Sequence, residues 1–164
     1  MALVLNDEQL MLRESARDFL NGRAPVGHLR TLRDNAVPEG FSSELWGEMA
    51  EMGWSAILVP EEYGGLDYGY TGLGVVLEEC GRTLTPSPLA GTALTAVTAL
   101  RLAGTPAQCA EHLPGIASGE RIIALACDET SLHQPEQIEA EAQASADGYR
   151  LNGRKVAVTD GQAA

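Results

Sequence analysis

Lysine is nearly absent from this sequence: Lys155 is the only one among 164 residues. The other basic residues are arginines, and 11 basic side chains stand against 23 acidic ones, for a formal net charge of −12. Lys and Arg supply most non-specific affinity for nucleic acids by neutralising phosphates. Without a basic cluster, the sequence predicts neither a nucleic-acid-binding nor a membrane-binding protein. Its 45% hydrophobic and 21% charged residues are typical of a folded globular chain.

The sequence also lacks the spacing of a metal site or a disulfide framework. Its three cysteines are an odd number, and neither they nor the three histidines have the spacing of metal ligands. The N-terminal segment has too short an apolar run for a secretory signal peptide. We therefore expect no metal, and a reducing, cytoplasmic compartment.

One uncharged stretch, residues 83–100, reaches the length of a membrane span. It contains nine Thr, Ser, Pro or Gly residues, too many hydroxyl groups and helix breakers for a lipid-facing helix. We expect this stretch to form a helix buried in protein, with its hydroxyl groups bonded to backbone.

Helical patterning predicts five helices in residues 1–119. Asn6 with Gln9, and Thr105 with Pro106 and Gln108, are typical of helix starts. The Pro- and Gly-rich connection over residues 25–40 is expected to be irregular. The predicted helices cover residues 7–20, 43–52, 71–83, 88–103 and 106–118.

The pattern changes at Arg121. Residues 122–127 are an apolar run with β-branched side chains, residues 139–144 alternate as in a half-buried strand, and residues 155–159 are strand-like. Asp147-Gly148 and Asn152-Gly153 are typical of hairpin turns. We predict an α+β fold: an all-helical bundle over residues 1–119, then the first antiparallel strands of an incomplete β-domain over residues 120–164. So few strands suggest a chain cut short inside its second domain.

No motif for catalysis emerges from the residues alone, since P-loop, GxGxxG, GxSxG and HExxH patterns are all missing. The acid pairs Glu61-Glu62, Glu78-Glu79 and Asp128-Glu129 are expected to be solvated surface pairs. Cys80 and Cys109 are expected to be small buried thiols.

Five segments, in order, resemble the acyl-CoA dehydrogenase family. The segments ELWGEMAEMGW (44–54), LVPEEYGGL (58–66) and VVLEECGR (75–82) are similar to its N-terminal helical domain. LPGIASGE (113–120) resembles the exit from that domain, and GYRLNGRK (148–155) resembles a hairpin of the middle β-domain. Together they extend over most of the chain in family order.

The resemblance implies a flavoprotein that removes hydrogens from Cα and Cβ of an acyl-CoA thioester. A carboxylate base takes the α-proton, and FAD accepts the β-hydride. In the family the base lies on a C-terminal helical domain, so it is expected beyond Ala164, and no catalytic residue is expected in this chain. Acyl-CoA as substrate, electron-transfer flavoprotein or a similar electron acceptor, and a homo- or hetero-oligomeric assembly are also implied. The resemblance further implies that residues 88–103 lie under the acyl chain, which is an alternative to the buried core helix expected from the residues.

The resemblance also implies three cofactor-binding residues. Asp128-Glu129-Thr130 stands where the family has Thr-Glu-Pro, and it keeps Glu129. Ala157-Val158-Thr159 stands for Trp-Ile-Thr: Val158 and Thr159 lie at the flavin, and the Thr159 hydroxyl bonds the ring near N5. Ala157 lacks the stacking indole.

Two other functions of the same fold stay open. The first is a non-catalytic partner subunit of a heteromeric acyl-CoA dehydrogenase, in which the altered flavin loop reflects a lost active site. The second is a flavin-dependent oxidase or monooxygenase.

Overall fold

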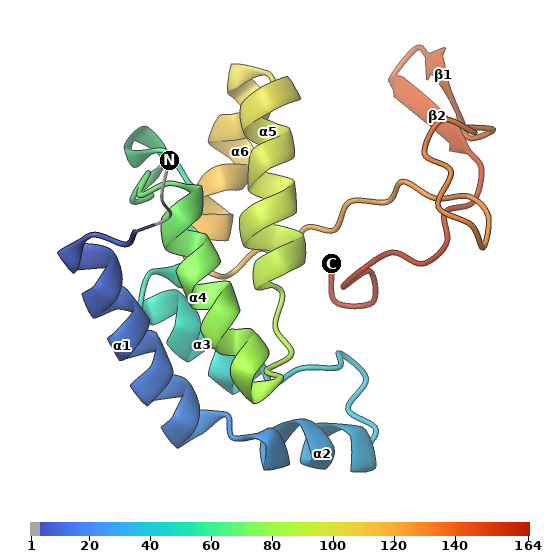
Figure 1. Ribbon diagram of the computed structural model, residues 1–164. Coiled ribbons are helices and arrows are strands. Elements are labelled where there is room, and N and C mark those ends of the chain that lie inside the picture. The colour runs from blue at the N-terminus through green and yellow to red at the C-terminus, as the bar shows by residue number, and fades with distance from the viewer. Residues whose placement is uncertain (1–3) are drawn as a thin grey trace.

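The computed structural model describes residues 4–164, and this part of the chain forms a bundle of helices followed by one β-hairpin (Figure 1). The predicted α+β class, with helices first and antiparallel strands after, is confirmed. The elements are α1 (Asp7–Arg23), α2 (Val26–Asp34), α3 (Ser43–Glu51), the 3₁₀ turns η1 (Trp54–Ala56) and η2 (Glu61–Tyr63), α4 (Tyr70–Thr83), the π-helix η3 (Leu89–Ala96), α5 (Val97–Ala103), α6 (Pro106–Ala117), β1 (Glu141–Ser145) and β2 (Gly148–Asn152).

Two helices begin at the predicted capping boxes. The Asn6 side chain accepts a bond from the Gln9 N–H at 2.8 Å, and the Gln9 side chain accepts one from the Asn6 N–H at 3.1 Å. Thr105 and Gln108 form the same arrangement at the start of α6. Each box satisfies amide groups that the first turn of a helix leaves without partners.

The expected irregular connection over residues 25–40 is wrong, because α2 occupies its first part. Pro25 is the N-cap in an extended conformation, which its fixed φ favours, and no side chain caps the helix. Val26, Leu29 and Leu32 recur at helical spacing and are half-buried, whereas Gly27 obscures the pattern in the sequence. The helix has no fully buried residue.

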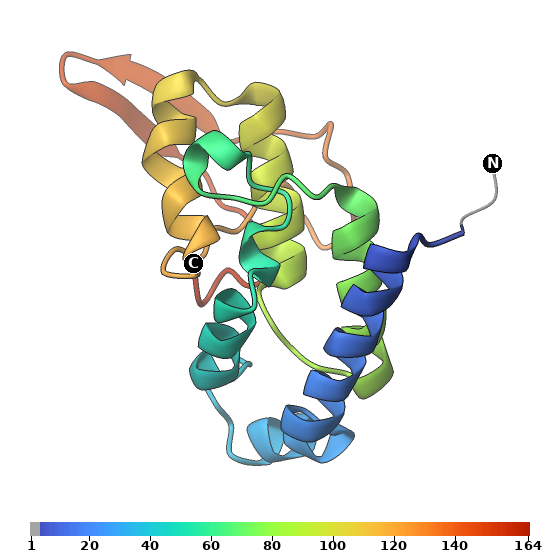
Figure 2. The same cartoon turned by 90° about the vertical axis from the view of Figure 1, so that its left-hand side faces the viewer.

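The core lies between α1, α3, α4, η3 and α6 (Figures 1 and 2). Trp54 of η1 is 1% exposed and meets the Phe19 ring of α1 edge-on at a centroid distance of 5.3 Å. Apolar residues follow the short turn η1 directly. Ile57, Leu58 and Val59 pack between the helices as part of the core. The fully buried side chains also include Leu20, Met49, Leu73, Val76, Leu89, Leu113 and Ile116.

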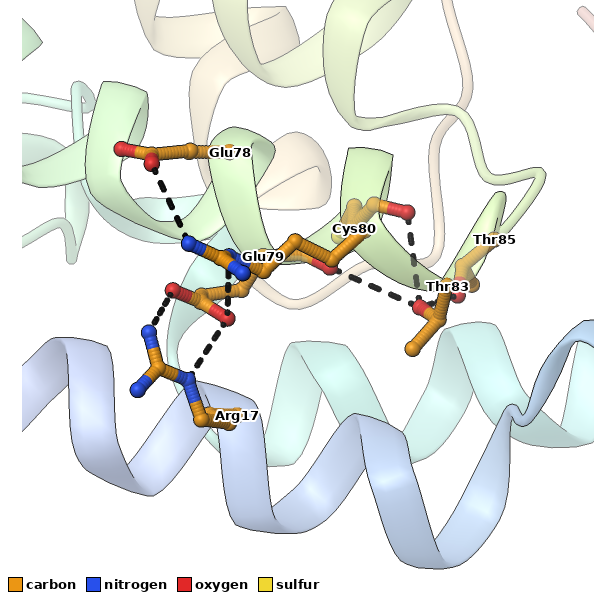
Figure 3. Close-up of polar contacts among 7 residues, drawn as sticks. Arg17, Glu78, Glu79, Cys80, Thr83 and Thr85 are labelled. Carbon is orange, nitrogen blue, oxygen red and sulfur yellow. Dashed lines mark hydrogen bonds and ion pairs between the residues drawn. The ribbon is translucent and has the colours of Figure 1, made fainter.

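Helices α1 and α4 lie side by side and share a buried carboxylate. Glu79 is 1% exposed, and Arg17 of α1 binds it through two bonds of 2.8 and 3.1 Å (Figure 3). The Arg82 Nε atom lies 3.4 Å from the same carboxylate. The expectation that Glu78 and Glu79 form a solvated pair is therefore wrong for Glu79, because α1 covers its face of α4.

The end of α6 is anchored to the bundle. The Trp46 indole donates to the Gly119 carbonyl at 2.8 Å, and the Ser55 hydroxyl donates to the Ala117 carbonyl at 2.9 Å. Gly119 has φ +78°, and a Cβ at this position would lie 2.4 Å from the Cβ of Ala50. Both the backbone conformation and the close approach require glycine here.

The hairpin is antiparallel, with Glu141 opposite Asn152 and Ser145 opposite Gly148. Its turn is Ala146-Asp147, one residue before the predicted dipeptide. All residues of β1 and β2 are exposed, so the expected half-buried strand is wrong. The predicted strands over residues 122–127 and 155–159 do not form in the described chain, because neither run has a neighbouring strand to complete a ladder.

Candidate functional site

A groove runs along one face of η3 and α5. It consists of three adjoining hollows of about 740, 390 and 220 Å³ that share Leu125, and we call them together the helical groove. Leu125 is 49% exposed and stands opposite the helices. The helical residues that line the two smaller hollows are Ala90, Gly91, Leu94, Thr95, Thr98 and Ala99, with Tyr70 from α4 and Thr159 from the C-terminal segment.

Small and hydroxyl-bearing side chains give the groove its uncharged helical wall. The Thr95 hydroxyl donates to the Ala90 carbonyl five residues back at 2.9 Å, which matches the wide turn of a π-helix. The Tyr70 and Thr98 hydroxyls lie 3.0 Å apart in the hollow of about 390 Å³. Residues 89–103 are thus helical as predicted, with one face in the core and the other on the groove.

The opposite wall is the extended segment that follows α6. The buried Thr92 hydroxyl donates to the Ile123 carbonyl at 3.1 Å and accepts from the Ile123 N–H at 3.2 Å. These two bonds satisfy the N–H and carbonyl groups of Ile123, which have no strand partner, and they hold the segment against η3. The predicted bonding of the threonine hydroxyls to backbone is confirmed for Thr92 and Thr95.

Thr159 reaches the groove, whereas Val158 does not line it. Thr159 is exposed in the smallest hollow, beside Ala90, Gly91 and Thr95. Val158 is half-buried, and its carbonyl accepts a bond of 3.1 Å from the Gly161 N–H. The structure thus brings Thr159, but not Val158, to the helical wall.

Asp160 packs directly against the π-helix. A Cβ added to Gly91 would lie 2.4 Å from the Asp160 Oδ2 atom, so the absence of a side chain at residue 91 makes room for the carboxyl group. The Oδ2 atom is buried and finds no hydrogen-bond partner among residues 4–164. Burial therefore raises the pKa of Asp160.

Glu129 lies away from the groove, in a cluster at the base of the hairpin. Its side chain is 8% exposed, and its carboxylate accepts bonds from Lys155 Nζ at 2.6 Å, from the Glu139 N–H at 2.7 Å and from the Ala140 N–H at 3.1 Å. The Lys155 bond and then the Glu139 amide lower the pKa of Glu129, against the burial that raises it.

Asp128 organises the loop beside this cluster. Its carboxylate lies 3.1 Å from His133 Nδ1 and accepts a bond from the Gln134 N–H at 3.2 Å. The His133 bond lowers the pKa of Asp128. The expected solvated pair Asp128-Glu129 is therefore wrong, since both carboxylates bond within the chain, whereas Glu61 and Glu62 are exposed as expected.

Among residues 4–164, the cysteines and the metal-ligating residue types form no further candidate site. Cys80 and Cys109 are buried, as predicted, and burial raises the pKa of the Cys80 thiol to about 11. Within residues 4–164, no three His, Cys, Asp or Glu side chains gather as a metal site would require. In that same part of the chain, no helix combines the length and apolar character needed to cross a membrane.

A family model described as acyl-CoA dehydrogenase, N-terminal domain, matches residues 6–120, which include the helical wall of the groove. The chain belongs to the acyl-CoA dehydrogenase family. The isovaleryl-CoA dehydrogenase of Arabidopsis thaliana mitochondria is 32% identical over 166 residues, which cover 99% of this chain and 40% of the relative. The chain spans about 40% of the length of several curated acyl-CoA dehydrogenases that it matches.

Solved acyl-CoA dehydrogenases share the fold. A variant of the Tcur3481-Tcur3483 steroid ACAD has a TM-score of 0.82 at 31% identity, over 94% of this chain and 42% of that one. An acyl-CoA dehydrogenase from Bacillus anthracis, solved with FAD, has a TM-score of 0.74 at 27% identity, over 94% of this chain and 27% of that one. The hairpin is included in these matches, because they extend beyond the helical bundle.

Sequence reasoning missed two participants in the site. Leu125 lines all three hollows, but its run was expected to be an ordinary strand. Lys155 pairs with Glu129 from 26 residues away, and only its rarity in the composition distinguishes it in the sequence.

Proposed function

We propose that this chain is the N-terminal part of a FAD-dependent acyl-CoA dehydrogenase, which oxidises the Cα–Cβ bond of an acyl-CoA thioester. Residues 1–119 form its helical domain, residues 120–164 begin its β-domain, and the catalytic carboxylate comes from outside these residues. An electron-transfer flavoprotein or a similar acceptor takes the electrons.

The helical groove is the observation that supports this proposal. Its helical wall carries no charged residue between Leu89 and Leu100, and small side chains such as Ala90 and Ala99 leave room for an apolar ligand. The part of the groove along residues 90–99 is uncharged and has a few hydroxyl groups, whereas Arg121 and His112 line the hollow of about 740 Å³. The uncharged part suits an acyl chain, because apolar contacts give affinity and hydroxyl groups orient the ligand. In this proposal the acyl chain lies along η3 and α5.

The described residues fit a flavin at one end of the groove. Thr159 is exposed there, so its hydroxyl can donate to the edge of the ring, whereas Val158 does not line this hollow. FAD would supply the hydride acceptor. Ala157 offers no ring for stacking, so the Thr159 hydroxyl is the proposed side-chain contact on this segment.

A non-catalytic partner subunit of a heteromeric acyl-CoA dehydrogenase is the second candidate. It is favoured by the engagement of the Glu129 carboxylate with Lys155 and two backbone amides, because an acid already bonded within the chain is not available to bind a flavin.

The product of the complete gene separates the two candidates. A yellow protein whose flavin absorbance falls on anaerobic addition of an acyl-CoA supports the enzyme, and a colourless protein supports the partner subunit. Ala99→Phe places a ring where two of the three hollows adjoin and should raise the acyl-CoA concentration needed for bleaching by about tenfold, a cost of about 1.4 kcal/mol in binding. Leu102→Phe, on the same helix at an 82% exposed position, is the control. Equal bleaching of Ala99→Phe and the wild type would show that the acyl chain lies elsewhere.

A further inference from the structure

The only lysine of the chain is held in the polar cluster at the base of the hairpin. Lys155 is 27% exposed, and its Nζ atom donates to Glu129 Oε1 at 2.6 Å and to the Cys127 carbonyl at 3.1 Å. Both bonds reach the same extended segment, residues 127–129. The lysine therefore fixes its own segment to the strand-like run that leaves the helical domain.

The Glu129 carboxylate joins a third segment to these two. It accepts the Glu139 and Ala140 amides, where the chain enters the hairpin. Three backbone segments, at residues 127–129, 139–140 and 155, thus meet at one ion pair. The pair joins these backbone segments in place of the hydrogen bonds of a sheet, since residues 122–127 and 155–159 form no strands in the described chain.

Residues 155–161 run from this pair to the helical groove. The Val156 N–H donates to the Asp128 carbonyl at 2.8 Å, and four residues after Lys155 the chain places Thr159 in the smallest hollow. Asp160 then packs against Gly91. The segment is therefore held at three points: the Glu129–Lys155 pair, the Val156–Asp128 backbone bond and the contact with η3. Thr159 lies between the first two and the last.

We propose that Glu129 and Lys155 are positioning residues, which hold residues 155–161 so that Thr159 enters the helical groove. The proposal rests on the proposed function in one respect, because the group that Thr159 would then meet is the flavin. Glu129 acts through Lys155 and the hairpin amides, without touching the flavin, because its carboxylate is 8% exposed and already bonded.

Hydrogen exchange and amine labelling of the full chain test the pair without any cofactor. Lys155→Met removes the ammonium group and keeps an unbranched stem. Exchange of the two hydrogen-bonded amides of the segment, Val156 and Gly161, should therefore rise by about tenfold while the far-UV melting of the helices stays unchanged. Lys155→Arg, which restores a cation, should bring exchange back to near the wild-type rate. Arg154→Met, at the exposed neighbouring residue, is the matched control. In Glu129→Ala, an amine-reactive reagent should label Lys155 faster than in the wild type, towards the rate of an exposed lysine introduced by Arg150→Lys.

Unchanged exchange in Lys155→Met, or an equal rise in Arg154→Met, would overturn the proposal. FAD titration of the complete gene product tests the link to the flavin separately. There, Lys155→Met should raise the FAD dissociation constant by about tenfold and Lys155→Arg should restore it. If exchange rises but FAD affinity does not change, the link to the flavin is wrong. If the wild type binds no FAD while exchange still depends on the pair, the proposed function fails and the positioning role is supported.

Discussion

Arg17→Met tests how much the buried carboxylate between α1 and α4 depends on its partner. Arg17 holds Glu79 through two bonds of 2.8 and 3.1 Å, and Glu79 is 1% exposed (Figure 3). Methionine keeps an unbranched stem that can pack along α4, but it deletes the guanidinium group. The variant therefore isolates the ion pair from the packing of the two helices.

The expected cost follows from the burial of Glu79. Removing one partner of a buried ion pair costs about 3–5 kcal/mol, because the other charge is left without compensation, and we expect about 3 kcal/mol here. The lower value applies because Arg82 still lies 3.4 Å from the carboxylate. For a chain of this size, about 3 kcal/mol lowers the melting temperature by about 6–12 °C.

The loss should depend on pH in a defined direction. The Arg17 bonds, and then its charge, lower the pKa of Glu79 from its ordinary value of 4.5, against the effect of burial. In the wild type, this contribution is fully present above pH 4.5 and is lost as the pH falls through the lowered pKa. In Arg17→Met, the largest cause of the lowering is gone. The difference in stability between the two proteins should therefore be largest near pH 7 and shrink below about pH 4.

Urea unfolding followed by circular dichroism, at pH 7 and at pH 3, measures the free energy of unfolding of both proteins. Arg30→Met, at an exposed position of α2, is the control and should have little effect. A difference below about 1 kcal/mol at pH 7, the range of a surface ion pair, would refute the reasoning. A difference of the same size at both pH values would show that packing, and not the charge of Glu79, is responsible.

Four further outcomes are expected. Gly119→Ala places a Cβ 2.4 Å from that of Ala50 at φ +78°, so urea unfolding should show a loss of about 2–4 kcal/mol, and a loss below 1 kcal/mol would mean that the contact relaxes. Thr105→Ala deletes the cap of α6 and should cost about 1 kcal/mol in the same assay, whereas Thr105→Ser should cost far less. In the complete gene product, Thr159→Val should shift the rate of flavin reduction by about tenfold or less, since one neutral hydrogen bond is worth about 0.5–1.5 kcal/mol; an unchanged rate and potential would place Thr159 away from the flavin. The 164-residue chain with added FAD and an electron acceptor should not dehydrogenate any acyl-CoA, and turnover would show that a base lies within it.

Local interactions made the helices predictable from the sequence. The Asn6 and Thr105 capping boxes join residues three apart, so the signal and the contact lie in the same short segment. The apolar spacing of α4 and the uncharged run of residues 83–100 could be identified for the same reason. Helix α2 was missed because Gly27 weakens its pattern and no side chain caps it.

The site was decided by contacts that no local pattern encodes. Arg17 and Glu79 are 62 residues apart, and Glu129 and Lys155 are 26 apart, so the burial of each acid depends on which element folds over it. In the same way, an alternating or apolar run becomes a strand only where a second strand supplies backbone partners. The sequence was sufficient to predict the helices other than α2, the two capping boxes and the hairpin. Tertiary contacts determine the burial of Glu79 and Glu129, the position of residues 122–125 along the groove and the approach of Thr159 to it, because they join chain segments that meet only after folding.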